Sequence, residues 1–118
     1  MIVGLSHIHV VCSDLAATES WFVGGLGAEL VERRESRGLA TGELLLARVR
    51  VLLRAADTDA VLAPGGERRY ALDHFTLHVD DIDGLVELLR ARGVEIEREP
   101  ADSPRNRVAF ISGARTTS

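Results

Sequence analysis

Residues 6–30 read SHIHVVCSDLAATESWFVGGLGAEL, a stretch that passes from a strand pattern to a helix pattern within a few positions. The apolar and β-branched run over residues 2–12 predicts a strand. The run stops at Asp14, a residue type that caps helix N-termini, so we expect a helix from Leu15 to about Val23. The stretch therefore predicts a strand that leads directly into a short helix.

The same order of elements occurs twice along the chain. His7 stands seven residues before Asp14, and His74 stands seven residues before Asp81, so the two copies align where the strand meets the helix. An internal repeat of this kind predicts a doubled structural unit. The other expected elements are strands at 28–35, 39–47 and 48–55 with breaks at Gly38 and Gly42, a second-copy strand at 70–80, a helix from Asp81 to Gly93, and strands at 94–97 and 107–112.

The length of 118 residues fits one domain made of both copies. Residues 57–69 contain Pro-Gly-Gly and no apolar periodicity, so we expect a linker between module one at 1–56 and module two at 70–118. Pro100 and Pro104 exclude a central strand between the last two strands. We therefore predict an α+β fold of two βαβββ modules, the second short of its last strand.

The composition excludes several classes of function. The net charge is −4, and 14 arginines are interspersed among 18 acidic residues, so no basic stripe suggests nucleic-acid binding. Cys12 is the single cysteine, which excludes an internal disulfide and suits a reducing compartment. No long apolar segment, phosphate loop or nucleophilic triad is found. We expect a soluble, cytoplasmic protein that binds neither nucleic acid nor membranes.

Two segments carry a family resemblance. Residues 6–30 contain a strand histidine, Asp14-Leu15, the aromatic pair Trp21-Phe22 and Leu26-Gly27. In this they resemble the opening of the vicinal oxygen chelate (glyoxalase, bleomycin resistance and dioxygenase) superfamily, and residues 73–110 resemble its second module. The resemblance implies that the modules form a curved mixed sheet shaped as a cup, and that two chains form a homodimer. It also places Trp21-Phe22 in the core.

In metal-dependent members of the superfamily, two strand histidines and two glutamates hold a divalent ion inside the cup. His7 and His74 match the histidine positions, and alternation along the strands puts His9 and His78 on the same faces. The glutamate positions are not matched, because the last strand is missing and the inward face of the strand near 48–55 carries Arg48, Arg50, Leu52 and Arg54. The cofactor is therefore either none or a divalent metal ion, for which four histidines offer nitrogen ligands.

Two functions of different class follow. The first is a binder of a small, anionic molecule without a standard metal, in a cup lined by His9, His78, Arg48, Arg50 and Arg54. The second is a metal-dependent lyase, isomerase or dioxygenase that uses His7 and His74. The histidines are alternatively structural and the arginines a solvated strand face. We expect Glu43 to face solvent and Cys12 to be an inert buried thiol.

Overall fold

The computed structural model describes residues 1–56 and 74–113, and it divides the chain into two compact units. The described residues of the first unit are 1–56 and 113, and those of the second are 74–112. Each unit is considered by itself below. The predicted linker at 57–69 lies outside the described residues. No helix in the described ranges is long and apolar enough to cross a membrane.

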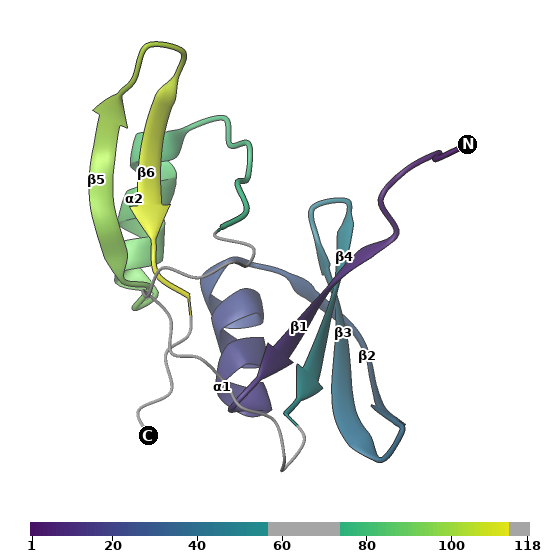
Figure 1. Ribbon diagram of the computed structural model, residues 1–118. Coiled ribbons are helices and arrows are strands. Elements are labelled where there is room, and N and C mark those ends of the chain that lie inside the picture. Colours follow the sequence, from purple (N-terminus) through teal and green to yellow (C-terminus); the bar gives the residue numbers. More distant parts are fainter. Residues whose placement is uncertain (57–73, 114–118) are drawn as a thin grey trace. The chain divides into compact units, whose positions relative to one another are not determined.

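The first unit is built on a four-stranded mixed sheet in the order β1-β4-β3-β2 (Figure 1). β1 pairs with β4 in parallel, while β3 pairs with β2 and β4 in antiparallel fashion. The order strand, helix and three strands agrees with the predicted first module. The strands are β1 (His7–Cys12), β2 (Glu29–Ser36), β3 (Leu39–Leu46) and β4 (Val49–Ala55).

β1 is shorter than predicted, because residues 2–6 form no strand. The first pair of the β1–β4 ladder joins His7 to Arg50, and β4 itself begins at Val49 after a turn. The backbone ahead of His7 therefore has no partner strand to bond with. Its apolar side chains, including Ile2 and Val3, are fully exposed.

The helical connection has two parts. α1 (Leu15–Ser20) begins at the predicted cap, where the Asp14 carboxylate accepts a hydrogen bond from the Ala17 N–H at 3.0 Å. The chain then widens into one turn of π-helix, η1 (Trp21–Gly25), closed by a bond of 3.2 Å from the Leu26 N–H to the Trp21 carbonyl. The helical segment thus extends beyond the predicted end.

The core of this unit lies between the helical connection and one face of the sheet. Alternation turns Ile8, Val10 and Cys12 of β1 toward it, and Leu44 and Leu53 are completely buried in it. Cys12 and Phe22 are buried there as predicted, and burial raises the pKa of the Cys12 thiol, which keeps it protonated. The sheet therefore presents its other face away from the core.

Two local predictions about β3 and β4 were wrong. Residues 47–48 form a two-residue turn with Ala47 at φ 53°, so Arg48 lies in the turn and not on the strand. Gly42 lies inside β3, where a Cβ atom would stand 3.2 Å from the Glu19 carboxylate of α1. Gly42 therefore permits close packing of the helix on the sheet, and the predicted break occurs only at Gly38.

The second unit is a helix packed on a hairpin. α2 (Ile82–Ala91) is capped by Asp81, which accepts from the Gly84 N–H at 3.0 Å, and it ends before Gly93 at φ 82°. The hairpin pairs β5 (Ile96–Asp102) with β6 (Arg107–Ile111). Pro100 lies within β5, which is longer than predicted, and a two-stranded hairpin has only edge strands, where proline is tolerated.

The predicted first strand of the second module is not formed over its described part. Residues 74–80 have no strand structure, and all seven are exposed. Their alternation is correct for a strand, with Phe75, Leu77 and Val79 on one side. Alternation defines a face, but a strand also needs a partner for its backbone, and these residues have no ladder in the described chain. The beginning of that prediction, residues 70–73, lies outside the described residues.

Candidate functional site

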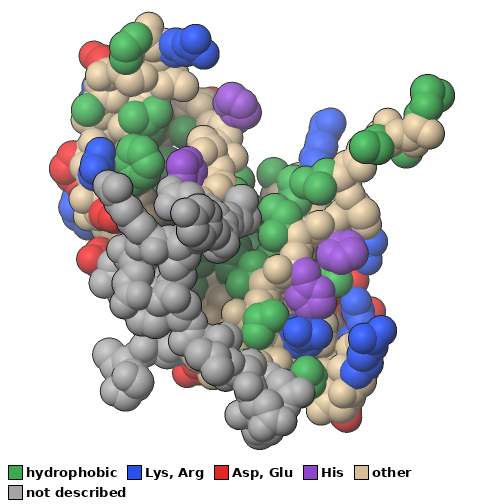
Figure 2. Space-filling model, viewed as in Figure 1, with side chains coloured by type: hydrophobic (Ala, Val, Ile, Leu, Met, Phe, Trp, Pro, Cys, Tyr) green, Lys and Arg blue, Asp and Glu red, His purple; other side chains and the backbone are tan. Residues whose placement is uncertain are grey.

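The side of the first-unit sheet that faces away from α1 gathers histidine and arginine side chains. His7 of β1 pairs with Arg50 of β4, and Val11 pairs with Arg54, so these side chains share one face. In Figure 2, histidine side chains lie next to arginine side chains on this part of the molecule. We call this surface the histidine face; it consists of His7, His9, Val11, Glu29, Glu32, Arg34, Thr41, Glu43, Leu45, Arg50, Leu52 and Arg54.

Glu43 lies at the centre of the histidine face, contrary to the prediction that it faces solvent. The residue is only 8% exposed. Its Oε1 atom accepts hydrogen bonds from Arg50 at 2.8 Å and from Arg34 at 3.1 Å. These two guanidinium groups hold the pKa of the Glu43 carboxyl below its ordinary value. Glu43 is therefore a charged group bound between two strands.

Sequence reasoning missed Arg34 and Glu43 as members of this face. Arg34 also donates to Glu32 at 3.2 Å, so a chain of ion pairs crosses from β2 to β4. The signal was present in the spacing, because a turn at residues 47–48 sets Glu43 opposite Leu52 and beside Arg50. Placing the turn one position earlier in the chain hid that register.

Arg54 differs from the other two arginines of the histidine face. Its Nε atom is buried, and among the described residues it has no hydrogen-bond partner. No carboxylate in the described part of the chain forms an ion pair with it. A guanidinium group in this state favours an incoming acceptor, because an unsatisfied buried donor is costly.

His9 lies near Arg54 and His7. Burial, the charge of Arg54 and then His7 lower the pKa of the His9 imidazole. The rings of His7 and His9 are 6.2 Å apart, and the Ser6 hydroxyl lies 3.0 Å from His7 Nδ1. At neutral pH His9 is therefore a neutral imidazole that can donate one hydrogen bond and accept another.

The remaining predicted site residues lie elsewhere. Arg48 is exposed in the turn before β4. His74 and His78 belong to the second unit, where both are exposed, and the His74 ring stands edge-on to Phe110 with centroids 6.3 Å apart. That these two histidines face the same cavity as His7 and His9 stays a prediction.

The residues of the histidine face do not fit a divalent metal ion by themselves. Across residues 1–56 and 74–113 no group of three or more histidine, cysteine or acidic side chains is arranged to hold one. His7 stands beside Arg50, and the nearest carboxylate, Glu43, is already bound to two guanidinium groups. Positive charge at these positions opposes the binding of a cation and favours that of an anion.

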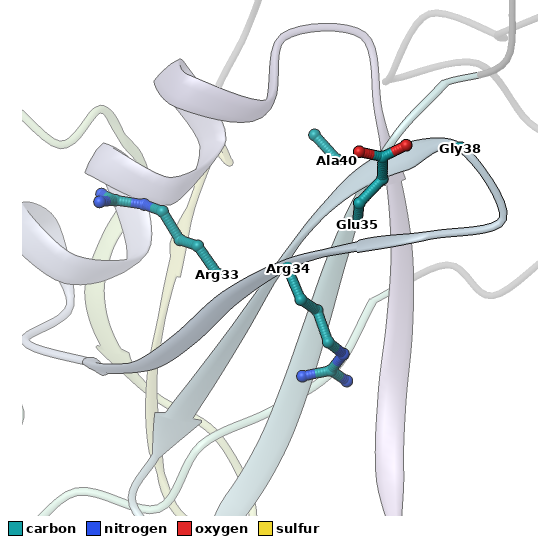
Figure 3. Close-up of a pocket in the computed structure, with 5 residues that line it drawn as sticks. All are labelled: Arg33, Arg34, Glu35, Gly38 and Ala40. Carbon is teal, nitrogen blue, oxygen red and sulfur yellow. The ribbon is translucent and has the colours of Figure 1, made fainter.

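A surface depression lies at the far end of the β2–β3 hairpin and is lined by Arg33, Arg34, Glu35, Gly38 and Ala40 (Figure 3). Arg33 and Arg34 point to opposite sides of the hairpin, as adjacent strand residues must. Arg33 pairs with Glu19 of α1, whereas Arg34 belongs to the histidine face. Because its side chains diverge, this depression is a weaker candidate site than the histidine face.

The fold and the strand histidine are those of a known family. The model of the Glyoxalase/Bleomycin resistance protein/Dioxygenase superfamily matches residues 4–117, and the chain belongs to this superfamily. No curated protein matches the sequence.

Three solved structures illustrate the similarity of fold. A glyoxylase/bleomycin resistance protein/dioxygenase domain from Frankia sp. EAN1pec has a TM-score of 0.80 at 19% identity, covering 97% of this chain and 91% of that chain. A glyoxalase family protein from Enterococcus faecalis has a TM-score of 0.78 at 19% identity, covering 93% and 89%. A variant of the fosfomycin resistance protein FosX from Listeria monocytogenes, complexed with Mn(II) and 1S,2S-dihydroxypropylphosphonic acid, has a TM-score of 0.68 at 22% identity, covering 96% and 86%.

Proposed function

We propose that this protein binds a small anionic molecule on the histidine face, without a standard catalytic metal. The observation that carries the proposal is the buried Arg54 Nε atom, which has no hydrogen-bond partner among the described residues. His9 and Arg50 flank it and supply further donors. A guanidinium fork next to imidazole groups suits a carboxylate or phosphate oxygen pair.

The relatives support both parts of the alternative considered from the sequence. FosX from Listeria was crystallised with a phosphonic acid and with Mn(II), so a fold of this kind accommodates an anion and a metal together. The anion agrees with the arginines of this chain. A metal-dependent lyase, isomerase or dioxygenase that uses His7 and His74 is the second candidate, and the superfamily match is the observation in its favour.

Calorimetric titration of the protein with benzoate tests the first proposal. Arg54→Gln is expected to weaken benzoate binding about tenfold or more, because a charge-assisted hydrogen bond is lost. The control is Arg105→Gln, which removes the same charge from the exposed turn between β5 and β6. Equal benzoate affinity of the Arg54 variant and the parent protein would refute the assignment.

The same titration separates the two candidates when it is repeated after dialysis against a chelator. Unchanged benzoate affinity, with no metal found by elemental analysis, supports the metal-free binder. Stoichiometric metal in the purified protein that disappears in His7→Ala establishes the metal-dependent reading instead.

We also propose that the protein is a cytoplasmic homodimer. In the described sheet β1 is an edge strand, and the residues ahead of it expose Ile2, Val3 and Leu5. An unpaired edge next to exposed apolar side chains is a surface that a second chain can cover. The lone buried cysteine agrees with a reducing compartment.

A further inference from the structure

Glu43 is the acidic residue of the histidine face whose contacts reach both neighbouring strands. It projects from β3, and its Oε1 atom accepts from Arg34 of β2 at 3.1 Å and from Arg50 of β4 at 2.8 Å. The other acidic residues of this face, Glu29 and Glu32, lie on the edge strand β2 and are exposed. Glu43 is buried, so its charge acts at short range on the arginines that surround it.

The ion pairs of Glu43 divide the three arginines of the histidine face into two kinds. Arg34 and Arg50 are bound to a carboxylate that belongs to the protein. Arg54 is the arginine of this face that has no such partner among the described residues. The lowered pKa of His9 leaves its imidazole uncharged at neutral pH. The uncompensated positive charge near β1 and β4 therefore comes mainly from one guanidinium group.

We infer that Glu43 determines the charge of the ligand, so that the site selects a monoanion such as a carboxylate over a dianion such as a phosphate monoester. This inference rests on the proposed anion-binding function. One free guanidinium balances one negative charge, and a second negative charge would lie close to the Glu43 carboxylate and be repelled by it. Val11 and Leu52 are the apolar neighbours of Arg54 and His9 on this face, so the monoanion carries an apolar group.

The test compares benzoate with phenyl phosphate, which share an aromatic ring and differ in charge. At about pH 8 phenyl phosphate is a dianion, because the second phosphate pKa is about 6. Calorimetric titration of the parent protein is expected to show tighter binding of benzoate. In Glu43→Gln, the affinity ratio of phenyl phosphate to benzoate is expected to rise about tenfold, because Arg34 and Arg50 lose their internal counter-charge.

Glu35→Gln is the matched control. It removes one negative charge from the neighbouring β2 strand, at a position on the opposite face from Arg34. The affinity ratio in this variant is expected to equal that of the parent protein. An equal rise in the Glu35 and Glu43 variants would overturn the inference, because net charge alone would then explain the effect.

A double variant keeps the test valid if Glu43→Gln folds poorly. Glu43→Gln combined with Arg34→Gln removes one charge of each sign and is expected to return the affinity ratio to the value of the parent protein. A parent protein that binds benzoate while its ratio is unchanged in Glu43→Gln overturns the role of Glu43 and leaves anion binding intact. A parent protein that binds neither compound overturns the proposed function together with the inference.

Discussion

His9 lies on the edge strand β1, and charged groups from two other strands face it. Arg54 and Arg50 of β4 contribute positive charge, and Glu43 of β3 contributes negative charge one strand further away. Burial and then Arg54 lower the pKa of His9 from its ordinary value of 6.5. The folded protein thus binds this proton less readily than the unfolded chain. The contribution of His9 to the free energy of unfolding is complete above pH 6.5 and decreases as the pH falls below that value.

Ligand binding should depend on pH through the same group. A bound anion favours the charged imidazolium, so benzoate affinity is expected to increase about three- to tenfold as the pH falls from about 7.5 to about 5.5. Calorimetry across this range measures the effect. His9→Asn should remove most of it, whereas His7→Asn, which changes a histidine two residues away on the same strand, should retain it. A pH profile that His9→Asn leaves unchanged would contradict this account.

Residue-level predictions from the sequence succeeded where the signal was local. Asp14 and Asp81 were predicted as helix caps because a short acidic side chain before an apolar run has one characteristic use, and both accept the expected hydrogen bond. Glu43 and Arg48 were placed wrongly, because the face of a strand residue depends on the turn that sets the register. A shift of one residue in a turn reverses every side chain beyond it.

At the scale of elements, the pairing of β3 with β4 supports both the core and the site. These strands carry Leu44 and Leu53 toward α1 and carry Glu43 and Arg54 to the histidine face. Loss of core packing here should therefore disturb the ion pairs on the opposite side.

Truncation of Leu53 measures the strength of this core. Leu53 is completely buried, so Leu53→Ala is expected to lower the free energy of unfolding by about 2–5 kcal/mol. Urea denaturation followed by the fluorescence of Trp21, the single tryptophan, reports on the first unit because Trp21 packs against its core. Val31→Ala, at a position 52% exposed on β2, is the control and should cost less than about 1 kcal/mol. Similar losses in both variants would show that Leu53 is not a core residue of this unit.

The strands whose pairing partner follows directly along the chain were predicted most closely. β2, β3 and β4 are joined by short turns, and their observed bounds lie within two residues of the predicted ones. β1 and residues 74–80 depend on partners far away in the sequence, and apolar alternation alone gave strands that are too long or not formed. The π-helical turn η1 has no local signal in Trp21-Phe22 that distinguishes it from α-helix.

At the scale of the whole molecule, superfamily membership fixes the type of fold and leaves the chemistry to individual side chains. The histidine at the end of the first apolar run was enough to suggest the family. The chemical character of the site comes instead from arginines at positions where a metal-binding relative carries carboxylates, and from an ion-pair network that depends on folding.

The assembly state is the property of the whole molecule that is tested most directly. Light scattering at micromolar concentration is expected to give twice the chain mass of 12.8 kDa. A dilution series should lower the apparent mass, because apolar contacts between chains dissociate by mass action. A constant mass equal to that of one chain would exclude the homodimer.

The parallel pairing of β1 with β4 has a consequence for the time at which the site forms. It joins His7 to Arg50 across 43 positions, the difference between their residue numbers, whereas β3 and β4 are joined by a two-residue turn. Distant pairings form late because the loop between them must first be closed. The arginines are thus in place on the hairpin before the histidines arrive, and an anion that reaches from Arg54 to His9 would hold the last-formed edge of the sheet against local opening.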